Sequence, residues 1–192
     1  MLRFLITGHH ACTDGDFSLN DLPGSGGRMD VLCRCVTSSL FLSHDLRRDV
    51  ECYLVLAGDP HSPRTLLFRG SEIRYLSPDE RSAGSLIKKA LGTICGDLFR
   101  ESSPGVYIRR GGLERLLREH PCAVLDEDGD DIRHAEFLPD VFVLSDHLDF
   151  TPDERELLAG LPAYSVGPRP LHADHAITVL LNEVDRRAEK WI

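Results

Sequence analysis

The apolar residues of the chain fall into two patterns, short continuous runs and longer stretches with the period of an α-helix. Continuous runs that end in polar or turn residues predict buried strands. These runs lie at Arg3–Gly8, Val50–Ala57, Thr65–Phe68, Glu72–Tyr75, Val106–Ile108, Cys122–Leu125, Val141–Leu144 and Ala163–Val166. Helical periods predict helices at Arg28–Ser43, from Ser77 to Leu91 or Leu98, at Gly112–Glu119, at Pro152–Ala159 and from Ala173 onward.

Strands and helices therefore alternate along most of the chain, and this order predicts an α/β fold with a largely parallel sheet. Thr65–Phe68 and Glu72–Tyr75 are close enough in sequence to form a hairpin, so the middle of the chain is expected to add an antiparallel edge. The helix that follows is expected to start with Ser77 as its cap and Pro78 in its first position.

The segment Ala163–Val184 organises the carboxyl-terminal part of the chain. It is predicted to form a short strand, a loop with Gly167 and two prolines, and an amphipathic helix. Two upstream runs, Cys122–Gly129 and Val141–His147, change abruptly from apolar to polar residues. Parallel strands that end in this way place side chains and backbone amides around a crevice at the carboxyl edge of a sheet. We therefore expect a binding site there.

Length and composition set broad limits on the protein. At 192 residues, 42% of them hydrophobic, the chain is long enough for one substantial core, and we expect a single domain over residues 1–192. No run approaches the roughly 18 apolar residues of a membrane span, and the amino terminus lacks the features of a signal peptide. We therefore expect a cytoplasmic protein with no membrane partner, and its six scattered cysteines should be free thiols.

The formal net charge of −9 bears on the partners of the protein. A negatively charged protein is a poor nonspecific binder of nucleic acid, because the phosphate backbone repels it. Any contact with RNA would therefore depend on a local basic patch.

Several polar groups are candidates for chemistry, and each also has a purely structural interpretation. The glycine-rich segment Gly24–Gly27 precedes a helix, as a phosphate-binding loop would, but no Lys-Ser/Thr pair follows it, so it can equally be a flexible loop. His172 and His175 have a spacing compatible with a metal site, yet no third ligand is near in sequence, and we expect no metal.

The start of the first helix carries Arg28 and Asp30 within one turn. An arginine there can hold a phosphate or a carbonyl oxygen, and a carboxylate can accept a proton or orient a base nitrogen. The alternative is an aspartate placed favourably at the amino end of a helix dipole. The charged run Ser43–Asp49 can belong to the same surface or be a solvated helix end.

Five segments taken together resemble the archaeal tRNA pseudouridine N1-methyltransferase family of the SPOUT superfamily. They are LPGSGGRMDVLCRCVTSSLFLSHDLRRDV, LSPDERSAGSLIKKAL, SPGVYIRRGGL, VFVLSDH and LHADHAITVLLNEVD, which begin at Leu22, Leu76, Ser103, Val141 and Leu171. The resemblance implies a cytoplasmic homodimer with a Rossmann-like sheet and a carboxyl-terminal trefoil knot over about residues 121–188. It also implies S-adenosylmethionine as methyl donor and N1 of pseudouridine 54, in the T-loop of tRNA, as the site of methylation.

Carried onto this sequence, the resemblance places the S-adenosylmethionine crevice among Leu125, Ser145, Ser165, Val166, Gly167, Leu171 and Ala176. The family often has Gly where Ser145 stands and Cys where Ala176 stands. A small residue persists at both positions, so the cofactor is still expected to fit. Ala176 excludes a cysteine-dependent role at that position.

The resemblance further implies that the substrate side is the first helix and its flanks. The residues expected to contact RNA are Arg34, His44, Arg47, Arg48, Arg109 and Arg110. Our hypothesis is that Asp30 orients or accepts the N1 proton while Arg28 stabilises negative charge that develops on the uracil ring. The alternatives are a SPOUT methyltransferase that acts on another RNA, such as ribosomal RNA, and a non-catalytic RNA-binding protein of the same fold.

Overall fold

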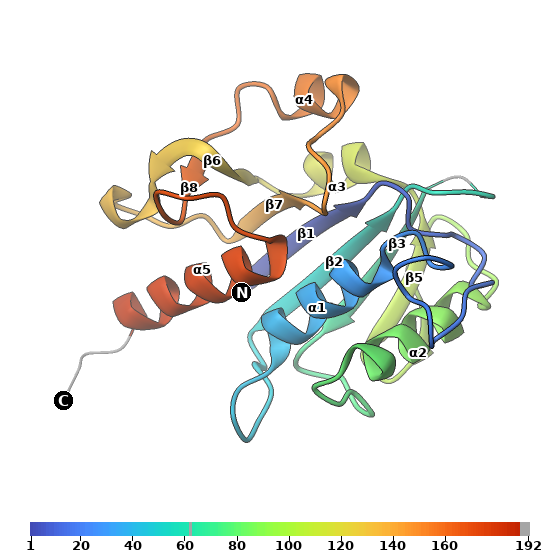
Figure 1. The fold of residues 1–192 in the computed structure, drawn as a ribbon. Helices are drawn as coiled ribbons and strands as arrows, with labels where there is room; N and C mark the ends of the chain where they lie inside the picture. Colours follow the sequence, from blue (N-terminus) through green and yellow to red (C-terminus); the bar gives the residue numbers. More distant parts are fainter. Residues whose placement is uncertain (62, 189–192) are drawn as a thin grey trace.

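An eight-stranded sheet runs through the protein, in the order β4-β5-β3-β2-β1-β7-β6-β8 (Figure 1). The computed structural model describes residues 1–61 and 63–188. The strands are β1 (Leu2–Gly8), β2 (Val50–Leu56), β3 (Arg64–Arg69), β4 (Arg100–Ser103), β5 (Val106–Arg110), β6 (Ala123–Asp131), β7 (Val141–Ser145) and β8 (Ala163–Ser165). The adjacent strands β2, β1, β7, β6 and β8 are parallel to one another, whereas β3, β5 and β4 form an antiparallel edge. The predicted α/β architecture is confirmed.

Helices cover both faces of this sheet. On one face lie α1 (Met29–Leu40), α2 (Glu80–Leu91) and α5 (Ala173–Ala188), and on the other lie α3 (Leu113–Glu119) and α4 (Pro152–Leu158). Successive residues of a strand point to opposite faces, so Phe4 and Ile6 of β1 pack in the larger core while Leu5 packs in the smaller one. Both faces are therefore buried, which explains the continuous apolar run of β1.

The antiparallel edge differs from the predicted hairpin. Glu72–Tyr75 is not a strand: the amide of Ile73 donates to the carbonyl of Arg69 in a tight turn, and Tyr75 has a φ of 62°. The second neighbour of β3 is β5 instead, and β5 in turn pairs with β4. The chain thus leaves the sheet after β3, forms α2, and returns as β4 at the outer edge, with β5 between β4 and β3.

The helix boundaries also correct three expectations. The side chain of Asp79, not that of Ser77, caps α2 by accepting from the amide of Ser82 at 2.8 Å. Helix α2 starts at Glu80, so Pro78 is not its first residue, and it ends at Leu91, the nearer of its two predicted limits. Helix α1 ends at Leu40, short of the predicted Ser43. The other predicted helices are present within one or two residues of their expected bounds.

Helices α1 and α5 are neighbours on the same face of the sheet (Figure 1). Helix α1 starts after the loop that follows the carboxyl end of β1, and α5 starts after the loop that follows β8. Both amino ends therefore lie at the carboxyl edge of the parallel strands, which is where open α/β sheets bind their ligands.

Candidate functional site

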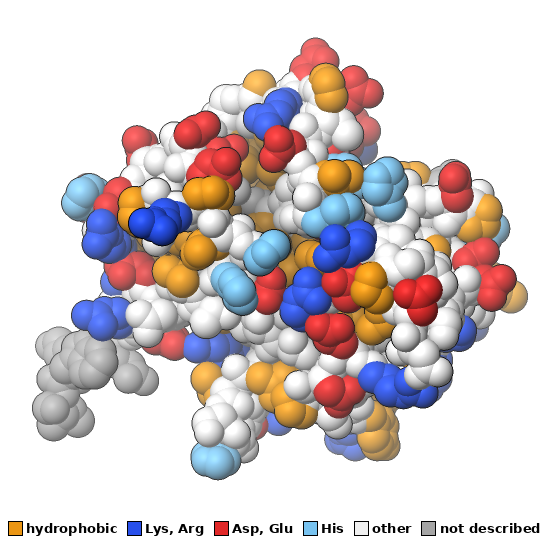
Figure 2. All heavy atoms as spheres, viewed as in Figure 1, with side chains coloured by type: hydrophobic (Ala, Val, Ile, Leu, Met, Phe, Trp, Pro, Cys, Tyr) orange, Lys and Arg blue, Asp and Glu red, His pale blue; other side chains and the backbone are white. Residues whose placement is uncertain are grey.

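A cavity of about 540 Å³ opens at the carboxyl ends of β6, β7 and β8, beside the start of α5. All seven residues expected to line a cofactor crevice line this cavity: Leu125, Ser145, Ser165, Val166, Gly167, Leu171 and Ala176. They come from the first half of β6, the ends of β7 and β8, one loop and one helix, so the sheet topology gathers them. Figure 2 shows histidine side chains (pale blue) and Lys or Arg side chains (blue) gathered across the middle of this face, below α4.

The remaining lining residues decide what kind of ligand fits. Apolar side chains such as Leu144 and Leu148 share the walls with five carboxylates: Asp126, Glu127, Asp128, Asp146 and Asp149. Adenine needs apolar walls with polar groups at its edges, and a sulfonium cation is attracted by nearby carboxylates. The residues present therefore fit S-adenosylmethionine. The side chains of Ser145 and Ala176 are small enough to leave the cavity open.

Local hydrogen bonds fix the polar part of the cavity wall. The hydroxyl of Ser165 donates to the carbonyl of Gly167 at 2.8 Å, and the hydroxyl of Ser145 donates to the carbonyl of Leu148. Each serine therefore closes a short turn directly after its strand.

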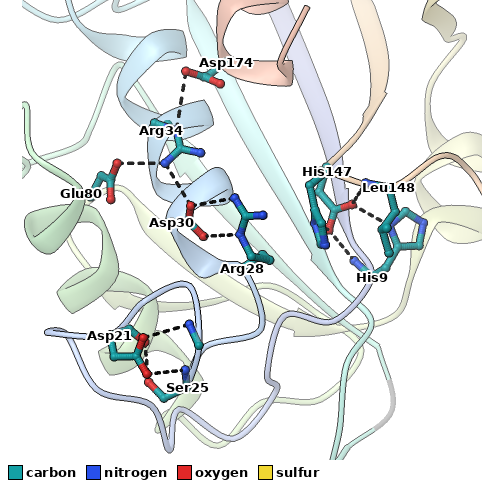
Figure 3. Close-up of polar contacts among 12 residues, drawn as sticks. His9, Asp21, Ser25, Arg28, Asp30, Arg34, Glu80, His147, Leu148 and Asp174 are labelled. Atoms are coloured by element: carbon teal, nitrogen blue, oxygen red, sulfur yellow. Dashed lines mark hydrogen bonds and ion pairs between the residues drawn. The ribbon is translucent and has the colours of Figure 1, made fainter.

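An ionic network lies at the amino end of α1 (Figure 3). Arg28 donates to both carboxylate oxygens of Asp30, from Nε at 3.0 Å and from Nη2 at 3.1 Å. Arg34, one turn further along α1, donates to Asp30 at 3.1 Å and to Glu80 of α2 at 3.0 Å. The side chain of Asp30 is buried while that of Arg28 is 40% exposed, so the carboxylate holds a guanidinium that faces outward.

The protonation of Asp30 follows from these contacts. Burial alone would raise the pKa of this carboxyl group, but the hydrogen bonds and charges of Arg28 and Arg34 outweigh burial and lower the pKa. A carboxylate with a lowered pKa is a weak base. The network therefore favours an orienting role for Asp30 over acceptance of a proton.

The same network reaches α5 through Asp174. One oxygen of this buried carboxylate lies 3.7 Å from Nε of Arg34 and 3.6 Å from Nε2 of His175. Its other oxygen, Oδ1, has no hydrogen-bond partner among the described residues. Asp174 stands between Ala173 and Ala176, which both line the cavity. Helix α5 thus joins the cavity to the network around Asp30.

A second polar cluster, centred on His9, was not predicted. His9 follows β1, and its ring nitrogens lie 2.9 Å from Asp146 Oδ1 and 2.8 Å from Glu154 Oε2. The sequence showed His9 only as one of two adjacent histidines, and its partners lie 137 and 145 residues away. The cluster could have been predicted only if β1 and β7 had been assumed to be adjacent strands, because His9 and Asp146 directly follow their carboxyl ends.

The structure separates two groups of residues that were expected to share one RNA surface. Helix α1 has 12 residues and so spans roughly 18 Å. Arg34 lies near its amino end, whereas His44, Arg47 and Arg48 follow its carboxyl end, at the opposite edge of the sheet. Arg47 is moreover paired with Asp185 of α5, at 2.8 and 2.5 Å. These three residues do not adjoin the cavity.

Arg109 also departs from its expected role. Its side chain is 5% exposed, donates to both oxygens of Glu119 at 2.9 and 2.6 Å, and lies 4.3 Å from the ring of Phe99. A guanidinium enclosed by β5, α3 and an aromatic ring cannot reach a phosphate, so the expectation of direct RNA contact is corrected for Arg109. The neighbouring Arg110 is exposed at the carboxyl end of β5.

The weaker candidates are resolved by their own contacts. In the glycine-rich loop, the amides of Gly24 and Ser25 both donate to the carboxylate of Asp21 at 3.0 Å, so they are not free for a phosphate (Figure 3). Over residues 1–61 and 63–188, no group of three or more His, Cys, Asp or Glu side chains is arranged to hold a metal ion. In the same residues, no helix is long and apolar enough to span a membrane.

Comparison with known proteins gives consistent results for the whole chain. A family described as "Putative SAM-dependent RNA methyltransferase" matches residues 1–189. A protein of Methanocorpusculum labreanum named tRNA (pseudouridine(54)-N(1))-methyltransferase is 60% identical over 194 aligned positions, which cover 99% of this chain and 100% of the relative. A relative of the same name from Haloferax volcanii is 51% identical, and the match covers 96% of each chain.

The fold is similar to that of a solved structure, Archaeoglobus fulgidus Nep1 bound to S-adenosylhomocysteine. The TM-score is 0.68, and the match covers 98% of this chain and 99% of the other. Only 13% of the residues are identical, so the likeness concerns the fold.

Proposed function

The chain belongs to the family of SAM-dependent RNA methyltransferases that matches residues 1–189, and from this membership we propose that it methylates N1 of pseudouridine 54 in tRNA. The observation that carries the proposal is the 60% identity, over nearly the whole chain, to a relative named for that reaction. S-adenosylmethionine supplies the methyl group as an electrophile when bound. The substrate is tRNA that already contains pseudouridine.

The cavity at the ends of β6, β7 and β8 is the proposed cofactor site. Leu125, Val166 and Leu171 would hold the adenine, while Ser145, Ser165, Gly167 and Ala176 leave space and backbone groups at its edges. The five carboxylates of the lining outnumber its two arginines, Arg155 and Arg169, and so complement the net positive charge of the cofactor. The comparison with a structure bound to S-adenosylhomocysteine supports this choice at the level of the fold.

The ends of β6, β7 and β8 and the start of α5 are also the proposed trefoil knot, over about residues 121–188. Strand β6 lies between β7 and β8 although it precedes both in sequence. The chain then crosses from α4 on one face of the sheet to α5 on the other. This order of crossings supports a threaded carboxyl-terminal segment, which is rare among connections.

Arg28 and Asp30 are the proposed catalytic pair. The N1 proton would pass to solvent water as the methyl group arrives, and the outward-facing guanidinium of Arg28 can stabilise the negative charge that develops on the uracil ring. Asp30 holds Arg28 in place through two hydrogen bonds, and its lowered pKa keeps it ionised. Most of the rate would then come from holding nitrogen and methyl in line, with no covalent intermediate on the protein.

Arg34 and Arg110 are the proposed RNA contacts that remain at the carboxyl edge of the sheet. Arg34 lies beside the catalytic pair, and Arg110 lies at the end of β5. Family membership further supports a homodimer that works in the cytoplasm. Light scattering of the purified protein tests the dimer directly.

The decisive experiment incubates the protein with labelled S-adenosylmethionine and two transcripts of one tRNA, carrying either pseudouridine or uridine at position 54. We expect label only in the pseudouridine transcript, and mass spectrometry should place the methyl group on that nucleoside. Transfer to ribosomal RNA, with none to tRNA, would overturn the proposed target. Binding of RNA with no transfer to any substrate would overturn the proposed activity.

A further inference from the structure

One wall of the proposed cofactor cavity is the segment between β7 and α4. Asp146, His147, Leu148, Asp149, Phe150 and Arg155 of this segment line the cavity. A single side chain, His9, contacts both ends of the segment, because it bonds to Asp146 at the start and to Glu154 near the end. The segment is otherwise a loop followed by the first turn of a short helix.

The geometry of these contacts determines the protonation of the ring. Nδ1 lies 2.9 Å from Asp146 and Nε2 lies 2.8 Å from Glu154. An ionised carboxylate only accepts hydrogen bonds, and a neutral imidazole carries one N–H. Both contacts can be hydrogen bonds at the same time only if His9 is an imidazolium. The side chains of His9, Asp146 and Glu154 are 8%, 1% and 16% exposed, so both bonds are largely shielded from water.

Both carboxylates are further engaged by the backbone around them. Asp146 accepts from the amide of His9 at 3.0 Å and from the amide of Leu148 at 3.0 Å. Glu154 accepts from the amide of Thr151 at 2.9 Å and thereby completes the capping box of α4. The imidazolium therefore links the carboxyl end of β1 to two groups that already fix the turns of the wall segment.

We propose that protonated His9 is a positioning residue that holds the β7–α4 segment in the conformation that binds the methyl donor. It does not line the cavity, so it acts through the wall and not by touching the ligand. In a neutral His9 ring, the unprotonated nitrogen would point its lone pair at a carboxylate oxygen. That contact would be repulsive, and the β7–α4 segment would lose its hydrogen bond at that end. This inference rests on the proposed function, because that function makes the cavity a cofactor site.

The surrounding charges are consistent with a ring that stays protonated. The hydrogen bond to Asp146 raises the pKa of His9, burial opposes it, and Glu154 adds to the rise, which brings the pKa to about 9. The other titratable groups near the pair are His147, whose Nδ1 lies 3.3 Å from Asp146, and Arg28, whose charge interacts with Asp146 from α1. Because the folded-state pKa is raised, the contribution of His9 is complete below about pH 6.5 and is lost as the pH rises through about 9.

The test measures the dissociation constant of S-adenosylhomocysteine by calorimetry for the natural protein and for H9Q, from pH 6 to pH 10. The ratio of the two constants cancels the titration of the ligand itself. We expect H9Q to bind about tenfold more weakly at pH 7 and the ratio to fall toward one above pH 9. A ratio near one at pH 7, or a large ratio that does not change with pH, would overturn the proposal.

A second variant, E154Q, removes the charge but keeps the cap, since Gln also completes a capping box. With one carboxylate gone, the pKa of His9 should fall, so the pH at which affinity is lost should move down relative to the natural protein. An unchanged pH profile for E154Q also contradicts the proposal, and this test does not depend on H9Q folding. H134Q, at an exposed histidine outside the cavity, is the matched control and should bind normally at every pH.

The measurements separate this inference from the proposed function. If the natural protein binds no S-adenosylhomocysteine at any pH, the cofactor site itself is wrong. If it binds and H9Q shows only a lower unfolding temperature with unchanged affinity, then His9 merely stabilises the fold. Nitrogen chemical shifts of the His9 ring at pH 8 give an independent check, because an imidazolium shows two protonated nitrogens whereas a ring with an ordinary pKa does not.

Discussion

Replacement of Asp30 by Asn is the sharpest test of the site around α1. The carboxylate accepts three hydrogen bonds, at 3.0 Å and 3.1 Å from Arg28 and at 3.1 Å from Arg34. In D30N the charge is gone, and the amide NH₂ turns a donor toward one of the guanidinium groups. Arg28 then loses the bidentate contact that fixes its direction.

The expected size of the effect follows from exposure. A hydrogen bond to a charged group contributes about 1.5–3 kcal/mol, and three buried ones would exceed the usual effect of a single substitution. The side chain of Asp30 is 7% exposed, but those of Arg28 and Arg34 are 40% and 33% exposed, so water screens the guanidinium side. We therefore expect D30N to lower the free energy of unfolding by about 3 kcal/mol.

The effect on catalysis should be separate from the effect on cofactor binding. Asp30 does not line the cavity, so the affinity for S-adenosylhomocysteine should stay within about twofold of normal. Single-turnover methyl transfer to tRNA carrying pseudouridine should slow by about 100-fold, because Arg28 is no longer held toward the base. Urea unfolding, calorimetry and the transfer assay measure the three quantities on the same preparation.

The control is E80Q, since Glu80 also accepts a hydrogen bond from Arg34 but is 43% exposed. It should change the free energy of unfolding by less than about 1 kcal/mol and leave transfer normal. Transfer by D30N at the normal rate would refute the role assigned to Asp30. Loss of cofactor affinity in D30N would instead show that the network around Asp30 maintains the shape of the cavity and does not orient Arg28 toward the target nucleobase.

The pH dependence of this stability has a definite sign. The folded-state pKa of Asp30 is lowered from 3.8, so its contribution is present above about pH 4 and is lost as the pH falls through the lower value. The difference in unfolding free energy between the natural protein and D30N should therefore shrink in acid and be constant at neutral pH.

Three further predictions concern Arg109, Gly27 and Cys52. R109A should lower the free energy of unfolding by about 3 kcal/mol in urea titrations, because it removes a buried side chain that donates twice to Glu119 and packs on the ring of Phe99, whereas R110A should change it little; equal stability of the two variants would contradict the structure. G27A should be destabilised by more than about 2 kcal/mol, because Gly27 has a φ of 65° and an added Cβ would lie 1.8 Å from the carbonyl oxygen of His10. A normal melting curve for G27A would contradict this expected destabilisation. Burial raises the pKa of Cys52 to about 12, so mass spectrometry should find this thiol alkylated at pH 8 only after unfolding.

The strands that could be predicted from the sequence are those whose side chains are buried on both faces of the sheet. Strands β1, β2 and β7 are buried on both faces, and their apolar runs are therefore visible without any structure. Strand β4 is different, because Arg100–Ser103 is a polar edge strand held by β5 alone, and an edge strand needs no apolar pattern. The hairpin prediction failed for a related reason, since adjacency in sequence does not decide which strand pairs with β3.

The cavity could be anticipated in part, because the ends of neighbouring parallel strands meet at one edge of the sheet. Ser145 and Ser165 are the last residues of β7 and β8, and Leu125 is the residue of β6 after which its pairing with β8 becomes irregular. Exposure of single arginines could not be anticipated in the same way. Arg109 and Arg110 are adjacent and chemically identical, yet their side chains point to opposite faces of β5, and only the pairing of β5 with its neighbours decides which one is enclosed.

The first turn of α5 couples the two halves of the site. Ala173 and Ala176 line the cavity, while Asp174 between them turns toward Arg34 of α1. A helix places neighbouring residues about 100° apart around its axis, so a single turn can face two partners at once. The distance between the wall of the proposed cofactor cavity and the guanidinium network is thus set by backbone geometry and not by a flexible loop. In-line transfer needs such a fixed distance, since a misplacement of about 1 Å can cost 100-fold in rate.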